Sequence, residues 1–235
     1  MILSIIIPVF NEERTIRQLI EKVSNVKLTQ GLKKEIIVIN DGSTDRTLKH
    51  LKQLGTKIKV INHAKNLGKG AAVRTGISYS TGDILVIQDA DLEYDPQDFN
   101  RLVEPILKNQ YQVVYGTRLK DYPLKLWGKD KTPLPTHYLG NKLLTALTNF
   151  LFSSNLTDME TCYKLFKKEV LVGIDLKSNK FDIEPELTAK ILKKGYKICD
   201  LPIKTQPRSF KEGKKINWKD GFSAIKALIK YRFVD

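Results

Sequence analysis

Short apolar runs alternate with stretches of helical periodicity through the first 115 residues of this 235-residue chain. Apolar, β-branched runs of this length predict strands, and apolar residues that recur every three or four positions predict helices. Strands that alternate with helices are typical of a parallel sheet covered on both faces. We therefore expect an α/β fold: a Rossmann-like, mostly parallel sheet flanked by helices. Its strands are predicted at residues 2–9, 35–40, 57–62, 83–88 and 112–115.

Polar residues that follow the predicted strands can accept hydrogen bonds from the free amides of the next helix. Asn11 is expected to cap the helix that carries Ile16, Leu19, Ile20 and Val23. The second helix is expected to be capped by Ser43, Thr44 or Asp45. Two further helices are predicted, over residues 71–80 and from residue 95.

The composition changes after the fifth predicted strand. Residues 118–135 are rich in Lys, Asp, Pro and Gly, which predicts a mobile loop. Beyond it, helices are predicted over residues 136–152 and 184–194, a strand over 197–205, and a basic amphipathic segment at the end. The expected organisation is one domain over residues 1–210, with halves at 1–117 and 118–210, and a C-terminal amphipathic extension over 211–235.

The net charge of the chain indicates which classes of molecule it binds. The net charge of +14 and the isoelectric point near 9.6 favour an anionic partner, such as a nucleotide, a lipid phosphate, a membrane surface or a nucleic acid. Cys162 and Cys199 are isolated, which favours a reducing compartment over a disulfide framework. No apolar run reaches the roughly 20 residues of a membrane span, and the chain starts directly with a predicted strand. We therefore expect neither a transmembrane helix nor a signal peptide.

Two carboxylates, Asp89 and Asp91, follow the apolar run at residues 83–88. Carboxylates this close after a buried strand repel each other and lose hydration unless a cation or a nucleotide hydroxyl compensates them. Their oxygens suit Mg²⁺ or Mn²⁺ that bridges a diphosphate, and Glu93 offers a third oxygen. The pattern predicts a metal-assisted nucleotide site at the carboxyl edge of the sheet.

Three other polar motifs follow predicted strands, and each also has a purely structural explanation. Asn11 and Glu12 fit a helix cap followed by an acid in the first turn, and residues 41–45 fit a turn followed by a cap. Residues 65–70 form a Gly-rich turn at the start of a helix. The backbone amides of this turn, with Lys65 and Lys69, are suited to a diphosphate.

Taken together, the motifs resemble those of a known family. They are PVFNE at residues 8–12, DGSTD at 41–45, NLGKG at 66–70 and DAD at 89–91. In order and approximate spacing they resemble family 2 glycosyltransferases of the GT-A fold. Later motifs narrow the resemblance to polyprenyl-phosphate sugar transferases, the dolichyl-phosphate mannose and glucose synthases and their prokaryotic relatives. These motifs are YGTR at 115–118, TDMETCYK at 157–164 and RSFKEGKK at 208–215, so the resemblance covers essentially the whole chain.

The resemblance implies a nucleotide pocket and a metal site. The base and ribose would be lined by Pro8, Val9, Asn11, Glu12 and Asp41. Asp89 would lie near the ribose or the metal, and Asp91 would be the principal metal ligand. Glu93 stands where many relatives have Gln, and it is the third predicted ligand.

The resemblance also implies a site for the phosphates of donor and acceptor. Arg118 and Arg208, with Lys211 or Lys214, would gather them, and Arg suits this role through its bidentate fork. Asp158 stands where a catalytic base is often proposed in related transferases. An acceptor phosphate is already largely ionised at neutral pH, so Asp158 could instead order the arginines or the acceptor loop. A helix cap at this position is a structural alternative.

The implied reaction is an inverting displacement in which a lipid phosphate oxygen attacks the anomeric carbon of a hexose and a nucleoside diphosphate departs. The residues expected to act in it are Asp91, Arg118, Asp158 and Arg208, with Mg²⁺ or Mn²⁺. The donor would be UDP-glucose or GDP-mannose, with UDP-glucose slightly favoured by residues 157–164. The acceptor would be a polyprenyl or dolichyl phosphate.

Basic residues dominate the chain from residue 204 to residue 232. On the predicted C-terminal helix, one apolar stripe is flanked by lysines and consists of Trp218, Phe222, Ile225, Ile229 and Phe233. This pattern fits a helix that lies in a membrane interface, and it equally fits a helix packed on the core with a solvated basic edge. We expect a cytoplasmic protein, peripheral on the cytoplasmic membrane face. A membrane-protein partner or a homo-oligomer would also give access to a lipid acceptor.

Other functions agree less well with the sequence. The main alternative is a family 2 transferase with a soluble glycan or polysaccharide acceptor, although residues 208–215 suit an anionic acceptor better. A nucleotidyltransferase needs a basic Gly-rich loop where residues 10–13 are acidic, and a dehydrogenase needs G-x-G-x-x-G there. A non-enzymatic basic adaptor for membranes or nucleic acid explains the charge but leaves Asp89 and Asp91 unexplained. We expect no specific nucleic-acid partner.

Overall fold

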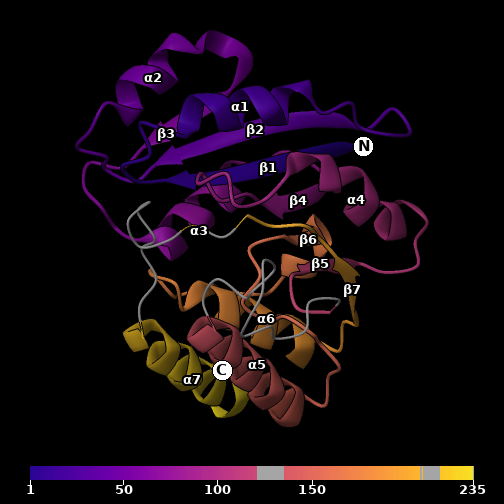
Figure 1. Cartoon of the computed structure of the whole chain (residues 1–235). Coiled ribbons are helices and arrows are strands. Elements are labelled where there is room, and N and C mark those ends of the chain that lie inside the picture. Colours follow the sequence, from indigo (N-terminus) through magenta and orange to yellow (C-terminus); the bar gives the residue numbers. More distant parts are fainter. Residues whose placement is uncertain (121–134, 207, 209–217, 235) are drawn as a thin grey trace.

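The computed structural model describes residues 1–120, 135–206, 208 and 218–234. Its sheet has seven strands in the order β3-β2-β1-β4-β6-β5-β7 (Figure 1). Neighbouring strands are parallel except β6, which runs antiparallel between β4 and β5. The strands are β1 (Ile2–Val9), β2 (Lys33–Asn40), β3 (Lys59–Asn62), β4 (Ile84–Ile87), β5 (Val113–Thr117), β6 (Lys164–Lys167) and β7 (Ile198–Pro202). The predicted α/β fold with a mostly parallel sheet is therefore confirmed.

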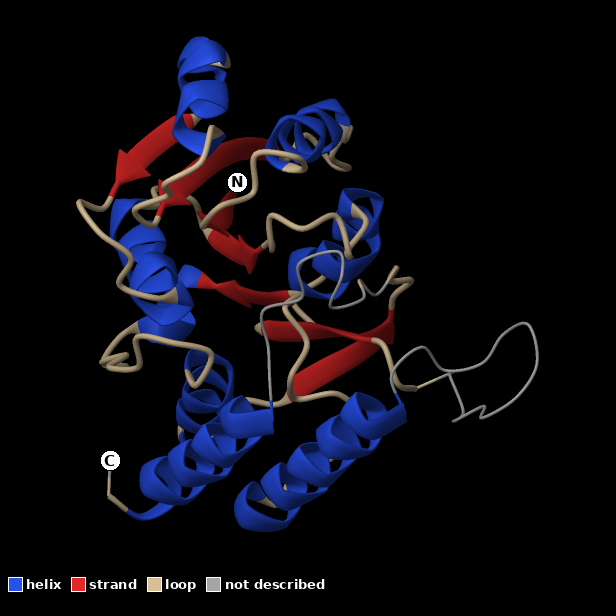
Figure 2. Cartoon of the chain, turned by 60° about the vertical axis from the view of Figure 1, so that its left-hand side comes forward, coloured by secondary structure: helices blue, strands red, loops and turns tan. Residues whose placement is uncertain are grey.

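Helices lie on both sides of this sheet (Figure 2). Helix α3 packs against β1 and β2, whereas α5, α6 and α7 pack together at the end of the molecule away from β3 (Figure 1). The α-helices in the described residues are α1 (Ile16–Asn25), α2 (Thr47–Gln53), α3 (Lys69–Tyr79), α4 (Phe99–Leu107), α5 (Pro135–Phe152), α6 (Ile183–Lys193) and α7 (Trp218–Phe233). The short 3₁₀ turns are Gly55–Lys57, Pro96–Asp98 and Lys168–Leu171.

The central strands are buried because they are apolar on both faces. Ile84–Ile87 of β4 is fully buried, and β1 pairs with it in register, Ile5 opposite Val86. On its other side Ile5 lies opposite Ile36 of β2, so β-branched side chains pack across the three strands. A second, smaller apolar cluster lies between α5 and α7 and includes Leu144 and Leu228. This second cluster attaches the C-terminal helix to the domain.

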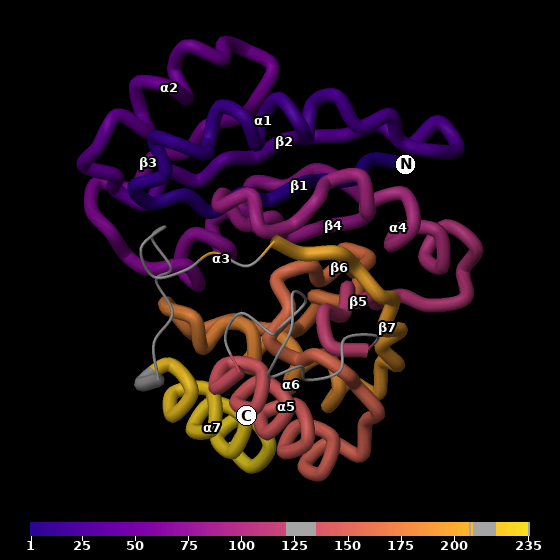
Figure 3. Tube along the Cα trace, in the orientation of Figure 1, coloured from indigo at the N-terminus to yellow at the C-terminus, as the bar shows by residue number. Residues whose placement is uncertain are grey.

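The strand order places the start of a crevice between β1 and β4. The chain runs from β1 outward to β2 and β3, and then returns to β4 on the other side of β1. Ligands of open α/β sheets bind outside the carboxyl ends of the strands at such a reversal. Because β6 is antiparallel, the residues before it lie at the same edge as the residues after β4 and β5. Figure 3 shows β1, β2 and β3 at one end of the molecule and α5 and α7 at the other.

The starts of α1 and α2 differ from the prediction. Asn11 does not cap α1, because Thr15 immediately precedes that helix and Asn11 has a left-handed backbone with φ of +51°. Its side-chain oxygen instead accepts a hydrogen bond of 2.8 Å from the amide of Thr44. The cap position of α2 is likewise occupied by Arg46 and not by Ser43, Thr44 or Asp45, although the Asp45 carboxylate accepts a hydrogen bond of 2.9 Å from the amide of Thr47. The loops after β1 and β2 are therefore bonded to each other.

Some predictions concern residues that the structure does not describe. Residues 121–134 of the predicted loop are among them, and so are Lys211 and Lys214. The boundaries proposed for the two halves and for the C-terminal extension stay predictions. None of the described helices has the length and hydropathy of a membrane span.

Candidate active site

A cavity of about 520 Å³ opens at the carboxyl edge of the sheet, between the first strands and the segment before β6. Residues from widely separated parts of the chain line it. The predicted site residues that do so are Pro8, Val9, Glu12, Asp41, Lys69, Asp89, Asp91, Glu93, Arg118 and Arg208. Asn11 and Asp158 are outside the lining. The structure thus brings most of the predicted residues together in one cavity.

Asp41 joins the end of β2 to the Gly-rich turn before α3. Its Oδ1 accepts hydrogen bonds from the ring Nδ1 of His63 at 2.7 Å and the amide of Leu67 at 2.9 Å. Its Oδ2 accepts from the amide of Gly68 at 2.8 Å. His63 contacts the hydroxyl of Thr75 through Nε2 at 3.0 Å, so the ring is held at both nitrogens. The carboxylate therefore fixes the shape of the turn at residues 65–70, which lines the cavity, through the backbone.

Gly68 is required by the path of this turn. Its φ is +99°, and a Cβ placed there would lie 2.3 Å from the carbonyl oxygen of Asn179. Only glycine meets both conditions without strain. The predicted Gly-rich turn is thus explained first by packing, while its amides are partly used by Asp41.

Arg208 joins the acidic side chains of the cavity. Its Nη2 lies 3.2 Å from Oε1 of Glu12 and 3.2 Å from Oδ2 of Asp91. Its backbone amide donates to Oε1 of Glu93 at 3.1 Å. Glu12 and Arg208 are 196 positions apart in the chain, so this contact connects the two ends of the described domain. The guanidinium partly neutralises a cluster of three carboxylates.

The pKa of Asp91 is raised despite its contact with Arg208. Burial raises its pKa to about 7, and the neighbouring carboxylates of Asp89 and Glu93 add to the rise while Arg208 opposes it. Within the described residues, no three His, Cys, Asp or Glu side chains converge into a ready-made metal site. Mg²⁺ sites at nucleotides are typically built from one or two carboxylates and substrate phosphates. The hard oxygens and the raised pKa of Asp91 fit such a shared site.

Asp89 has a different partner from Asp91. Lys69 lies 2.7 Å from its Oδ1 and 3.0 Å from Oε1 of Glu184. Burial alone would raise the pKa of Asp89, but the ammonium of Lys69 outweighs it, and the pKa lies below its ordinary value. Glu184 also pairs with the fully buried Lys164. Lys69 is thus part of a buried chain of alternating charges, and its predicted contact with a diphosphate stays a prediction.

Arg118 is held by Asp158. Its Nε and Nη2 donate to the two carboxylate oxygens at 2.7 and 2.8 Å, and its backbone amide donates a third bond at 3.0 Å. Asp158 is fully buried and does not line the cavity. The helix-cap alternative is wrong, because the next element after Asp158 is β6. This geometry favours the interpretation that Asp158 orders Arg118 over the interpretation that it is a base.

Several cavity residues were absent from the predicted site. Glu160 and Cys162 lie in the TDMETCYK motif, from which only Asp158 had been selected. The cavity is also lined by Glu184, at the start of a predicted helix, and by Asp220, an acid in the basic C-terminal segment. An acid within a motif and an acid at a helix start have ordinary structural explanations, so the sequence offers little signal for them.

Comparison with known sequences identifies the family of the chain. The model of the family described as Glycosyl transferase family 2 matches residues 4–174. The chain is 28% identical over 246 residues to UDP-N-acetylglucosamine–dolichyl-phosphate N-acetylglucosaminyltransferase of Methanococcus voltae, which covers 96% of this chain and 94% of that protein. It is 30% identical over 224 residues to dolichol-phosphate mannosyltransferase of Pyrococcus furiosus, with 92% and 61% covered.

Comparison with solved structures defines the fold. A crystal structure of glucosyl-3-phosphoglycerate synthase from Mycobacterium tuberculosis, in complex with Mg²⁺ and uridine diphosphate, matches with a TM-score of 0.74. The identity is 21%, over 99% of this chain and 80% of that one. Another structure of that enzyme contains Mn²⁺ and UDP-glucose and matches with a TM-score of 0.70. The fold is thus that of a GT-A glycosyltransferase. The chain belongs to glycosyl transferase family 2.

Proposed function

We propose that this glycosyltransferase moves a hexose, with inversion, from UDP-glucose or GDP-mannose to the phosphate of a polyprenyl or dolichyl phosphate. The observation that carries the proposal is the meeting of two arginines, Arg118 and Arg208, with Asp91 in one cavity. A neutral glycan acceptor would not need two guanidinium groups there, whereas an anionic acceptor would. The similarity to two dolichyl-phosphate transferases supports the same choice.

The chain's own residues would act by placing charge. An oxygen of the acceptor phosphate attacks the anomeric carbon, the bond from that carbon to the diphosphate breaks, and the nucleoside diphosphate leaves with the electron pair. The phosphate is already ionised, so no proton has to be removed. Arg118, fixed by Asp158, would hold the acceptor phosphate close to the anomeric carbon. A buried, ion-paired Asp158 agrees with a reaction that needs no base.

Asp91 and the diphosphate oxygens would together hold Mg²⁺ or Mn²⁺. The cation would neutralise charge that develops on the leaving diphosphate. Arg208, which now shares its guanidinium between Glu12 and Asp91, would then be available to a phosphate. Mg²⁺ and Mn²⁺ accept the same oxygen ligands, so both stay within the proposal.

A broad apolar face beside the cavity supports access to a lipid. On α5 and α7, six large apolar side chains are between 47% and 83% exposed: Leu139, Leu143, Phe150, Phe222, Ile229 and Phe233. The opposite face of α7 packs on the domain through Ala224, Leu228 and Tyr231. Asp220, in the first turn of α7, lines the cavity, so the face begins beside it. The interpretation of α7 as a helix packed on the core is thus confirmed for one side, and the membrane-interface interpretation of the exposed side stays a prediction.

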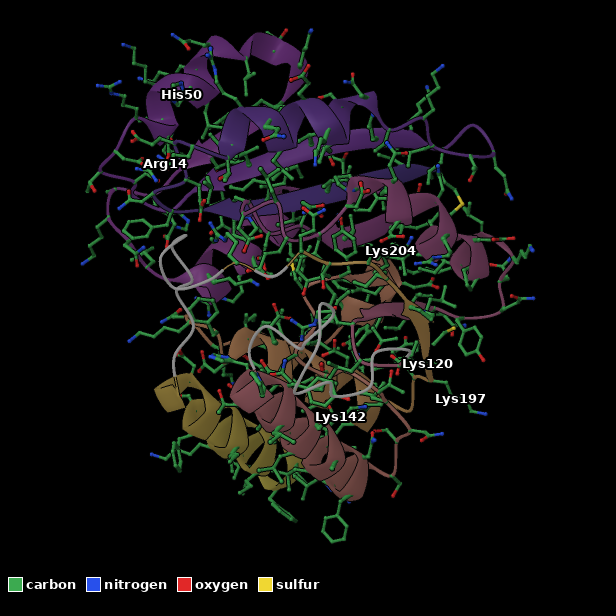
Figure 4. The ribbon with its side chains drawn as sticks, viewed as in Figure 1. Arg14, His50, Lys120, Lys142, Lys197 and Lys204 are labelled. Carbon is green, nitrogen blue, oxygen red and sulfur yellow. The ribbon has the colours of Figure 1, made fainter. Side chains whose placement is uncertain are left out.

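We propose that this face lies on an anionic membrane surface. Lys226 and Lys230 are exposed on α7, and Lys142 lies on α5 (Figure 4). Lys120 and Lys197 are exposed in the same half of the molecule (Figure 4). Apolar side chains rimmed by lysines match the acyl boundary and the anionic headgroups of a bilayer. Peripheral binding would present the cavity to a lipid phosphate.

The test is sugar transfer to a short polyprenyl phosphate with Mg²⁺, using UDP-glucose, UDP-N-acetylglucosamine and GDP-mannose in parallel. We expect glycolipid from one donor, lost on addition of EDTA and strongly reduced by Arg118→Gln. Arg17→Gln, an exposed arginine on α1 outside the cavity, is the matched control. Transfer to a soluble glycan with no glycolipid from any donor would overturn the lipid acceptor and leave the family unchanged.

A further inference from the structure

Glu160 is an acid of the cavity that the proposed reaction does not use. It lies in the segment before β6, is half-buried, and lines the cavity. Its Oε1 is buried and has no hydrogen-bond partner in the part of the chain that the structure describes. A buried polar atom without a partner costs free energy unless a ligand supplies one. The unpartnered oxygen of Glu160 therefore points to a ligand that supplies its hydrogen-bond partner.

The other acids of the cavity have partners within the chain. Asp89 and Glu184 pair with Lys69, and Asp91 and Glu12 pair with Arg208. Lys164 and Arg118 are the two cations that lower the pKa of Glu160. Each forms its ion pair with another acid: Lys164 with Glu184 and Arg118 with Asp158. Oε1 of Glu184 also has no hydrogen-bond partner among the described residues, but the ammonium of Lys69 compensates it. Glu160 differs from Glu184 because its unpartnered Oε1 has no such ion pair in the described part of the chain.

The sheet order indicates which part of the donor would meet Glu160. The predicted nucleotide motifs follow β1 and β2, and Asp89 and Asp91 follow β4. The next strand across the sheet is β6, and its antiparallel direction places Glu160 at the same edge. A nucleotide sugar laid along this edge, with its base at β1 and β2 and its diphosphate at β4, would carry its sugar toward Glu160.

The chemistry of Glu160 selects among ligand groups. A carboxyl group repels the phosphates of donor and acceptor, so the part of a nucleotide sugar that suits it best is neutral and polar. Sugar hydroxyls both donate and accept hydrogen bonds, which a carboxyl group can match with its two oxygens. Burial raises the pKa of Glu160 to about 7, although Lys164 opposes the rise. At neutral pH this side chain is thus available both as a donor and as an acceptor.

We propose that Glu160 binds hydroxyl groups of the transferred hexose and so determines which sugar is accepted and how it is oriented. This inference rests on the proposed function, because it requires a nucleotide-sugar donor in this cavity. A buried carboxyl that is left without a hydroxyl partner discriminates strongly against a sugar that lacks or misplaces that hydroxyl.

The test separates sugar binding from nucleotide binding. Calorimetry with Mg²⁺ would give Kd values for UDP and UDP-glucose, or for GDP and GDP-mannose, with the wild type, Glu160→Ala and Glu160→Gln. We expect the nucleoside diphosphate Kd of Glu160→Ala to stay within about twofold and its nucleotide-sugar Kd to rise roughly 10- to 100-fold. The Gln variant, which keeps the shape, should lose less. Glu169→Gln, at an exposed site after β6, should change neither value.

A second readout is the ratio of kcat/KM between UDP-glucose and its epimer UDP-galactose, or between GDP-mannose and GDP-glucose. We expect this ratio to move toward one in Glu160→Ala, which a merely structural defect would not cause. An equal loss of diphosphate and sugar affinity, or no loss of either, would overturn the inference alone. If the folded wild type binds the diphosphates but no nucleotide sugar, the proposed function fails, and the inference fails with it.

Discussion

The two sides of the cavity hold their charged groups by different means. On the side of β1, β2 and α3, the Asp41 carboxylate accepts two bonds from backbone amides and one from His63. On the side of β5, β6 and α6, the charges are paired with one another, Arg118 with Asp158 and Lys164 with Glu184. A carboxylate held by amides fixes the shape of a loop. The ion pair of Arg118 with Asp158 instead fixes the position of a guanidinium that lines the cavity.

This difference has an energetic consequence. A loop held by amides depends on backbone geometry, so it is sensitive to the substitution of a single glycine. A buried ion pair depends on the presence of both partners, and removal of one leaves an uncompensated charge. We propose that the side of β1, β2 and α3 is the nucleotide side. Variants there should therefore impair binding of the nucleoside diphosphate, and variants that break the pair of Arg118 and Asp158 on the other side should impair the acceptor step. The following changes test that division.

The largest effect is expected at the junction of the two sides. Asp91→Asn keeps the size of the side chain and removes the charge that would share the cation, so transfer should fall by roughly 100- to 1,000-fold. Transfer rates with Mg²⁺ and with EDTA measure it. The variant should be insensitive to EDTA, and Asp175→Asn, at an exposed position, should behave as the wild type. Metal-stimulated transfer by Asp91→Asn would contradict the predicted role.

Asp158→Asn should act on the acceptor side alone. An amide cannot accept both side-chain bonds from Arg118, so the acceptor KM should rise roughly 10- to 100-fold while the Kd of the nucleoside diphosphate is unchanged. Arg118→Lys, which keeps the charge but loses the fork, should show the same pattern. If Asp158 were a base, kcat would fall instead and would recover as the pH is raised. Steady-state kinetics between pH 6 and about pH 9 distinguish the two cases.

Gly68→Ala should act on the nucleotide side alone. The new Cβ would meet the carbonyl oxygen of Asn179 at a φ of +99°, so the free energy of unfolding should fall by about 2 to 4 kcal/mol. The shifted turn should also weaken binding of the diphosphate. Gly31→Ala is the control, because its φ of +69° is surrounded by open space. It should cost about 1 kcal/mol, measured by urea unfolding, and should leave binding intact.

Glu160→Gln should show that the ionised carboxyl group of Glu160 lowers the free energy of unfolding as the pH rises. Its native pKa of about 7 lies above the ordinary value of 4.5, so the native state binds more protons than the unfolded state between these pH values. Wild-type stability therefore falls as the pH rises through this window. The Gln variant should gain stability relative to the wild type from pH 4.5 to pH 8, by at most about 3 kcal/mol. Metal-free urea unfolding at both pH values measures this gain, and a pH-independent difference would contradict it.

The smallest effect is expected outside the cavity, on the apolar face of α5 and α7. Phe150→Ser combined with Phe233→Ser removes two of its six exposed side chains, so binding to anionic vesicles should weaken roughly three- to tenfold. Sedimentation with phosphatidylcholine vesicles, with and without phosphatidylglycerol, measures it. Val172→Ser removes an equally exposed apolar side chain elsewhere and is the control. If the double variant binds vesicles as the wild type does, the proposal that this face lies on a membrane is wrong.

The residues that were predictable follow parallel strands directly. Pro8, Asp41 and Asp89 come at or just after the ends of β1, β2 and β4, and all three line the cavity. An apolar run followed by a polar motif is enough to predict a residue at the carboxyl edge of the sheet, because the carboxyl ends of parallel strands all lie at that edge. Asn11 shows the limit of local rules. Its predicted cap was lost to a bond with Thr44, since the neighbouring loop offered an amide.

The sequence by itself determined the α/β fold, the family and the motifs around the nucleotide side, because these depend on local periodicity and on residues that are close in the chain. Only the tertiary structure decided how the charges are paired. Asp89 meets Lys69, and Asp91 meets Arg208, 117 positions away. The antiparallel direction of β6 likewise brought Glu160 to the cavity. Such pairings depend on which strands lie side by side, and strand order is set by the packing of the whole core.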